Sequence, residues 1–147
     1  MPTLFSRIID GEIPGRFVWC DTRCVVFLDV SPVTPGHALV VPREEVDHWI
    51  DASPELLAHL HEVAREIGAA QLAAFGGERA GLVIAGYGVP HLHLHVFPTS
   101  DMAPFANLDG APADEDDLDA AARALRSALV ERGHHDVVEA SLLASAR

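Results

Sequence analysis

The chain has 147 residues, of which 49% are hydrophobic, and a formal net charge of −12 at pH 7. This length fits a single domain over residues 1–147, and the acidic charge argues against nonspecific binding to nucleic acids or anionic membranes. All ten cationic residues are arginine, which excludes a P-loop lysine, a Schiff base and a lysyl-nucleotide. The longest apolar runs fall short of the ~20 residues that span a bilayer. The amino terminus also lacks a signal-peptide pattern, so we expect a cytoplasmic protein.

The first third of the chain predicts a hairpin. After the apolar residues 4–9 and a turn, the β-branched and aromatic runs 17–20 and 24–28 predict two antiparallel strands joined by a short loop. Cys20 and Cys24 flank that loop, and we interpret them as reduced strand residues in a cytoplasmic chain.

The middle of the chain predicts a strand and the main helix. Residues 37–42 form the strand, which opens with His37. Ser53 is a good N-cap and Pro54 suits the first helical position. Apolar residues then recur at the helical period to Phe75, where two glycines end the helix.

Three alternate histidines dominate the next stretch. Residues 81–85 predict a strand, a glycine-containing turn follows, and His91, His93 and His95 then alternate with apolar residues up to Phe97. Successive side chains of a strand point to opposite faces, so a strand here places all three imidazoles on one face. Such a row is suited to nucleophilic catalysis by a neutral imidazole or to zinc binding, and an incidental structural role is the weakest interpretation.

The last third predicts a loop over residues 99–113 and a second helix over residues 114–132. The first turn of this helix is strongly acidic, which favours the positive end of the helix dipole. His134 and His135 close the helix, and we expect both to be solvated.

Three segments resemble the histidine triad (HIT) family. Residues 91–97 resemble its His-φ-His-φ-His-φ-φ signature, where φ is apolar. Residues 4–14 and 27–42 resemble its amino-terminal and central segments, in the family's order and spacing. Both segments are most similar to the Hint branch. The resemblance implies an α+β, HIT-like fold with about five antiparallel strands, one long helix and a second acidic helix. It also implies a homodimer formed through the long helix and an edge strand.

The resemblance also implies roles for individual residues. His93 is the expected nucleophile, His95 contacts phosphate oxygens, and His91 and His37 support the site. Asp29 binds the ribose hydroxyls, since a carboxylate accepts two hydrogen bonds from a diol. The remaining expected contacts to the nucleotide come from Leu4, Phe5, Ile8, Val30, Gly86, Gly88 and Val89.

Two departures from the family stand out. Tyr87 and Gly88 occupy the places of a glutamine and a hydroxyl residue before the triad, so one side-chain contact to the phosphate or leaving group is missing. Thr3 and Ser6 stand where some members carry two zinc-binding cysteines. Hydroxyls are poor zinc ligands, so we predict no metal there and no cofactor.

The resemblance implies attack at the α-phosphate of a purine nucleotide or nucleotide conjugate. The substrate is expected to be a nucleoside phosphoramidate or a dinucleoside polyphosphate, processed by hydrolysis or nucleotidyl transfer through a nucleotidyl-histidine. Two alternatives remain open. One is a non-catalytic nucleotide-binding protein. The other is a metal-dependent hydrolase with the histidines as zinc ligands, which is weakened because no nearby His-Glu or Cys motif completes the metal shell.

Overall fold

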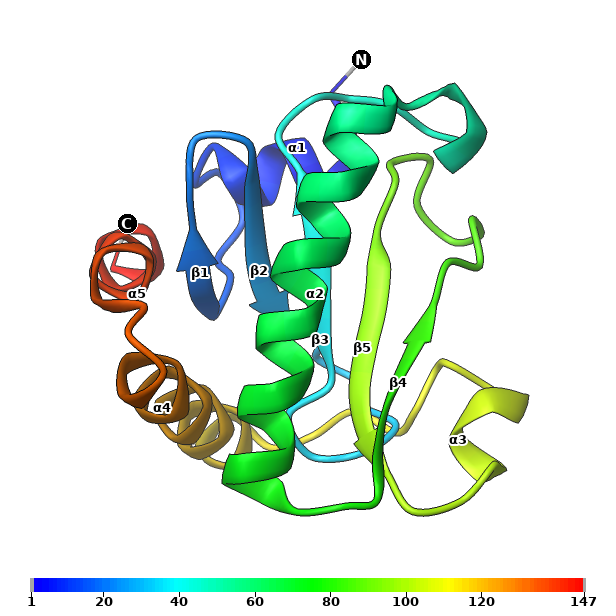
Figure 1. Cartoon of the computed structure of the whole chain (residues 1–147). Coiled ribbons are helices and arrows are strands. Elements are labelled where there is room, and N and C mark those ends of the chain that lie inside the picture. Colours follow the sequence, from blue (N-terminus) through cyan, green and yellow to red (C-terminus); the bar gives the residue numbers. More distant parts are fainter. Residues whose placement is uncertain (1, 147) are drawn as a thin grey trace.

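One antiparallel sheet organises the protein (Figure 1). In the computed structural model, which describes residues 2–146, five strands lie in the order β1-β2-β3-β5-β4. The predicted α+β fold with about five antiparallel strands is thereby confirmed. The strands are β1 (Phe17–Cys20), β2 (Cys24–Leu28), β3 (Ala38–Pro42), β4 (Arg79–Val83) and β5 (Leu94–Thr99).

The strand register brings distant histidines together. The predicted hairpin is confirmed, with Phe17 of β1 opposite Phe27 of β2. Leu39 of β3 lies opposite both Phe27 and His95 of β5. The segment just before β3, which carries His37, therefore lies beside β5.

Helices cover the sheet on both sides. The described residues form α1 (Leu4–Ile9), α2 (Pro54–Phe75), α3 (Ala103–Ala106), α4 (Glu115–Glu131) and α5 (His135–Ser145), with a short 3-10 turn, η1 (Trp49–Asp51). The main helix has the predicted ends, because the Ser53 side chain accepts a hydrogen bond from the Leu56 N–H, and Gly76 closes it at φ +78°. Among these helices none is long and apolar enough to cross a membrane.

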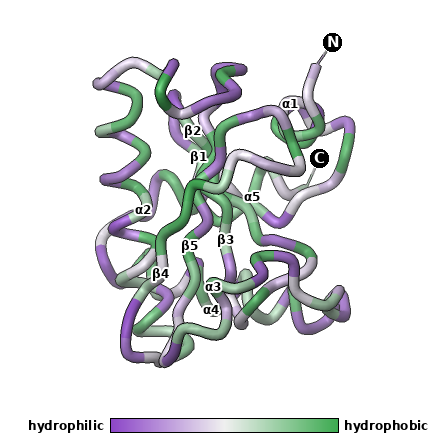
Figure 2. The backbone as a smooth tube through the Cα atoms, turned by 90° about the vertical axis from the view of Figure 1, so that its right-hand side faces the viewer, coloured by the Kyte–Doolittle hydropathy of each residue, from purple (hydrophilic) through white to green (hydrophobic). Residues whose placement is uncertain are grey.

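The two faces of the sheet have different partners. Leu60 and Ile67 of α2, Leu125 of α4 and Leu94 of β5 are fully buried in one apolar cluster. The opposite face carries a second cluster in which Phe5 of α1 packs among aromatic residues. The side view of Figure 2 places α2 on one side of the strands and α1 on the other. The candidate functional site lies on the α1 face.

The strand boundaries around the triad differ from those predicted. β4 begins and ends two residues earlier than residues 81–85, and β5 begins at Leu94, so the prediction of one strand over residues 91–97 was wrong. The Leu92 N–H donates to the Val46 carbonyl and the His91 N–H to the Val89 carbonyl, which keeps this segment out of the ladder. The predicted alternation still holds, because Leu92 lies with Leu94 in the α2-side cluster.

The carboxyl-terminal third departs most from prediction. The acidic helix is confirmed as α4, but the predicted loop contains α3 and the chain continues into α5 against β1. Gly133, at φ +96°, separates α4 from α5. His134 is only partly solvated: its side chain is 25% exposed, its Nε2 lies 2.7 Å from Glu66, and its ring centroid lies 4.8 Å from that of Trp19.

Candidate functional site

Four histidines converge on the α1 side of the sheet. His37, His91, His93 and His95 are all buried, with exposed fractions of 0, 0, 5 and 8%. They come from the segment before β3, from the irregular residues 91–93 and from β5. The ring centroids of His93 and His95 lie 5.0 Å apart, and those of His37 and His95 lie 5.2 Å apart. The fold thus assembles one cluster from positions far apart in sequence.

The backbone fixes the tautomer of His93. Its Nδ1 lies 2.7 Å from the His91 carbonyl oxygen. A carbonyl only accepts hydrogen bonds, so Nδ1 carries the proton and Nε2 keeps a lone pair. Burial lowers the pKa of His93. The Phe5 ring packs edge-on against the His93 imidazole, with 5.0 Å between the ring centroids. His93 is therefore a neutral imidazole with one nucleophilic nitrogen.

Two contacts lock His91 in turn. Its Nε2 donates to the Pro42 carbonyl at 2.8 Å, so its Nδ1 is the acceptor of a hydrogen bond from the Thr3 hydroxyl at 2.7 Å. Thr3 also caps α1 by accepting the Ser6 N–H, and the Ser6 hydroxyl donates to Glu45. The helix α1 and the carbonyl that orients His93 are thus tied together through side chains.

A second histidine pair is held differently. The Val33 N–H donates to Nδ1 of His37 at 3.2 Å, so His37 donates through Nε2 to Nδ1 of His95, 3.0 Å away. The remaining nitrogen of His95, Nε2, then carries a proton. Burial, reinforced by the neighbouring histidine in each case, lowers the pKa of His37 to about 3 and that of His95 to about 4. At pH 7 this pair offers a neutral N–H donor and no imidazolium charge.

A cavity of about 240 Å³ adjoins the cluster. Asp29 lies on its wall, where its Oδ1 accepts the Ser31 N–H at 2.9 Å and its Oδ2 lies 3.8 Å from Nε2 of His37. Burial raises the pKa of Asp29. The residues expected to surround a nucleoside line this cavity together: Leu4, Phe5, Ile8, Asp29 and Val30.

The glycine turn lies outside this cavity. Gly86 and Gly88 adopt φ +81° and +88°, and a Cβ added at either would meet no atom within 4 Å. Tyr87 between them is 86% exposed. Val89 packs against the α1-side cluster, and its carbonyl accepts the His91 N–H at 2.8 Å. The turn is therefore an open backbone surface directly before the triad.

Sequence reasoning missed several residues of this region. Leu118 of α4 and Arg16 line the same cavity as Phe5 and Asp29. Arg16 is held by Asp119 at 2.7 Å. No local pattern marks these residues, because their position depends on how α4 packs against the loop before β1.

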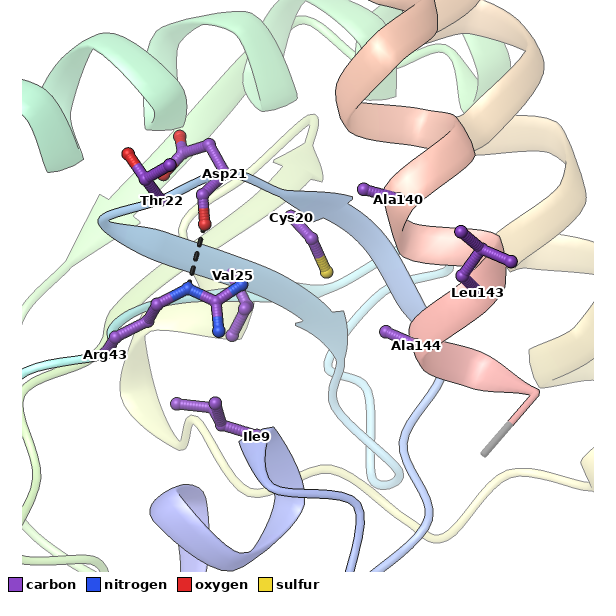
Figure 3. A pocket seen from close by; sticks show the side chains of 9 residues that line it. All are labelled: Ile9, Cys20, Asp21, Thr22, Val25, Arg43, Ala140, Leu143 and Ala144. Carbon is purple, nitrogen blue, oxygen red and sulfur yellow. Dashed lines mark hydrogen bonds between the residues drawn. The ribbon is translucent and has the colours of Figure 1, made fainter.

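Two further features of the structure have some properties of a site. Oxygen and nitrogen atoms of Asp29, His37 and His95 lie within 4.8 Å of one another, but the facing nitrogens of the two histidines are already bonded to each other. A larger cavity, about 640 Å³, lies between the β1–β2 hairpin and α5 (Figure 3). It is lined by none of the four histidines, and its walls are mostly apolar.

Comparisons with known proteins agree with this geometry. Residues 10–102 match the HIT domain. The chain is 32% identical over 117 residues to an uncharacterized HIT-like protein of Saccharolobus solfataricus, covering 76% of this chain and 84% of that protein. It superposes with a TM-score of 0.77 on a hypothetical histidine triad nucleotide-binding protein from Sulfolobus tokodaii, at 25% identity over 86% of this chain and 91% of that one.

A third match is a HIT family hydrolase from Legionella pneumophila, with a TM-score of 0.61 and 30% identity over 69% of this chain and 96% of that one. The matched region contains the histidines of the cluster, and the shared fold is the one that brings them together. By sequence and by fold, the chain belongs to the HIT family.

Proposed function

We propose that this protein is a Hint-like nucleotide hydrolase or nucleotidyl transferase that acts at the α-phosphate of a purine nucleoside phosphoramidate or dinucleoside polyphosphate. The observation that carries the proposal is the hydrogen bond from Nδ1 of His93 to the His91 carbonyl. It leaves Nε2 as a lone-pair donor in a buried site, which is the state that a histidine nucleophile requires.

The reaction runs in two steps. Nε2 of His93 forms a bond to the α-phosphorus, and the bond from phosphorus to the leaving amine or phosphate breaks. The His95 Nε2–H donates to a phosphoryl oxygen and stabilises the charge that gathers there. A leaving amine takes its proton from solvent. The oxygen of water, or of a second acceptor, then forms a bond to phosphorus and loses its proton to solvent. The bond from phosphorus to Nε2 breaks, and its electron pair returns to Nε2, which restores the neutral His93.

The cavity beside the cluster suits the nucleoside. Its apolar wall, with Leu4, Phe5 and Ile8, offers surface for a base. The free Oδ2 of Asp29 is available to the ribose hydroxyls. The open backbone at Gly86 and Gly88 offers N–H groups to phosphate oxygens. The nucleotide-binding and hydrolase descriptions of the Sulfolobus and Legionella relatives support the same assignment.

We also propose a homodimer. β4 is an edge strand, paired on one side only by β5, and its Leu82 is 45% exposed. An exposed apolar edge is a template for pairing with a second copy. Light scattering of the purified chain tests this, and a monomer at micromolar concentration would contradict it.

Intact-mass spectrometry tests the reaction. After brief mixing with adenosine or guanosine phosphoramidate, we expect a mass increase of one nucleotide monophosphate on the parent chain and none on His93→Ala. His61→Ala is the matched control, because His61 is exposed on α2 and bonds only its own helix. Rates of amine release in the three proteins decide the case if the adduct is too short-lived to observe.

These experiments distinguish the proposed mechanism from the two alternatives. Turnover by His93→Ala at the parent rate would overturn the mechanism. Tight nucleotide binding with no turnover of any nucleotide would instead establish the non-catalytic binding protein. Activity that depends on stoichiometric zinc at the histidines would establish the metal-dependent alternative.

A further inference from the structure

We infer that the protein has a zinc site on the α2 side of the sheet, formed by Asp21, Cys24 and His59. Asp21 and Cys24 come from the loop and second strand of the β1–β2 hairpin, and His59 comes from α2. One ligand atom from each side chain lies within 4.8 Å of the others. None of the three residues belongs to the histidine cluster, so the inference does not depend on the proposed function.

The distances match a tetrahedral zinc ion after small shifts. Zinc bonds of about 2.0–2.3 Å at tetrahedral angles place ligand atoms about 3.3–3.6 Å apart. Here Nε2 of His59 lies 2.8 Å from Oδ2 of Asp21, and Sγ of Cys24 lies 3.5 Å from the same oxygen. The thiol and imidazole protons therefore point at one carboxylate oxygen, where a divalent cation could replace them.

The carboxylate is oriented by other groups. The Trp19 indole N–H donates to Oδ2 of Asp21 at 2.9 Å, and the backbone N–H groups of Arg23 and Cys24 each donate to Oδ1 at 2.8 Å. Such outer contacts hold a metal ligand in place before the ion arrives. These three N–H groups do not need to give up a proton for a metal to bind. They therefore keep the Asp21 carboxylate oriented toward Cys24 and His59.

The surroundings favour zinc in particular. One thiolate, one imidazole and one carboxylate form the mixed sulfur, nitrogen and oxygen set that zinc accepts, whereas magnesium and calcium prefer oxygen alone. Cys24 is buried, but the side chains of Asp21 and His59 are 18% and 29% exposed, so the ion has a route from solvent. A fourth ligand position is left for water. A bound ion would clamp the hairpin to α2.

The chain supplies its own control. Cys20 lies four residues from Cys24 but belongs to the α1-side cluster, whereas Cys24 belongs to the α2-side cluster. Figure 3 shows the Cys20 sulfur directed into the cavity next to α5, away from the Asp21 side chain. A sulfur ligand at the proposed site must therefore be Cys24.

Cobalt titration of the reduced, metal-free full chain tests the inference. Co²⁺ reports tetrahedral zinc sites by its visible bands and reports a thiolate ligand by a sulfur-to-cobalt charge-transfer band. We expect one equivalent to bind with both signals, and zinc to displace it. Cys24→Ser should abolish the charge-transfer band, and His59→Gln should weaken binding at least tenfold. Cys20→Ser should behave as the parent.

The variants separate metal binding from folding. Glutamine at position 59 can still donate a hydrogen bond to Asp21 but is a poor zinc ligand, so His59→Gln keeps the fold testable. At one equivalent, zinc should raise the melting temperature of the parent and of Cys20→Ser more than that of His59→Gln. Absence of the charge-transfer band, or its persistence in Cys24→Ser, would overturn the inference. Cobalt bound by the histidine cluster alone would show no such band, because that cluster contains no sulfur.

Discussion

The two histidine pairs of the site are held in contrasting ways. His91 and His93 each direct a ring nitrogen at a backbone carbonyl, at 2.8 and 2.7 Å. His37 and His95 are linked mainly to each other, at 3.0 Å. A carbonyl cannot change its hydrogen-bonding role, so the first pair has one stable tautomer. The second pair keeps its arrangement only while His37 stays neutral and accepts the Val33 N–H.

This contrast suggests that the two pairs have different roles in the proposed reaction. The proposed nucleophile, His93, sits in the pair whose protonation is fixed by the main chain. The proposed donor to the phosphoryl group, His95, sits in the pair that side-chain changes can disturb most easily.

After loss of the proposed nucleophile itself, removal of His37 should give the largest effect. His37→Ala leaves Nδ1 of His95 without its donor, so the proton can move to that nitrogen and Nε2 loses its role. We expect kcat for phosphoramidate hydrolysis to fall about 100-fold, the lower end of the range for a general acid-base contact. His37→Gln should recover part of the loss, because its amide can donate to His95. Equal kcat in the alanine variant and the parent would show that the pair is not needed.

Acid should destabilise the second pair selectively. The pKa of His37 falls from the ordinary 6.5 to about 3 in the folded protein, so the unfolded chain binds the proton more readily. This contribution is fully present above pH 6.5 and is lost progressively as the pH falls toward about 3. Urea unfolding at several pH values between 7.5 and 4 should show a steeper fall in the free energy of unfolding for the parent than for His37→Asn. Parallel curves would contradict the neutral, buried state of His37.

Truncation in the cavity should affect binding more than chemistry. Leu118→Ala removes part of a side chain that is buried at the cavity wall. Loss of about 1–2 kcal/mol of apolar contact with a base corresponds to roughly a tenfold rise in KM. The kcat should change little, because neither histidine pair is touched. A fall in kcat with unchanged KM would place α4 in the chemistry instead.

Loss of the Thr3 hydroxyl should give the smallest effect on rate. Thr3→Val removes the donor to Nδ1 of His91, but the bond from Nε2 to the Pro42 carbonyl remains. We expect kcat to fall only a few-fold. The free energy of unfolding should drop by about 1 kcal/mol, since Thr3 also caps α1. Thr22→Val, at an exposed loop position, is the control. A loss of kcat as large as that of His37→Ala would erase the contrast between the two pairs.

The sequence by itself determined the elements with strong local patterns. The hairpin, the capped helix α2 and the acidic helix α4 follow from β-branched and aromatic runs, capping residues and helical period, which act between near neighbours. The triad motif identified the family and predicted which histidines to examine. It placed the start of β5 wrongly, because the Leu92 N–H finds its partner in Val46, 46 residues away.

Only the tertiary structure decided how those residues work. The tautomer of His93 depends on the His91 carbonyl, whose direction follows from the irregular backbone of residues 91–93. The tautomer of His95 depends on His37, which reaches it through the packing of β3 against β5. Two groups of residues come together without any sequence motif that predicts them. One is Leu118 and Arg16 at the cavity. The other is Asp21, Cys24 and His59, which lie between the β1–β2 hairpin and α2. Local sequence fixes backbone preferences over a few residues, whereas hydrogen-bond direction and burial depend on which distant segments pack together.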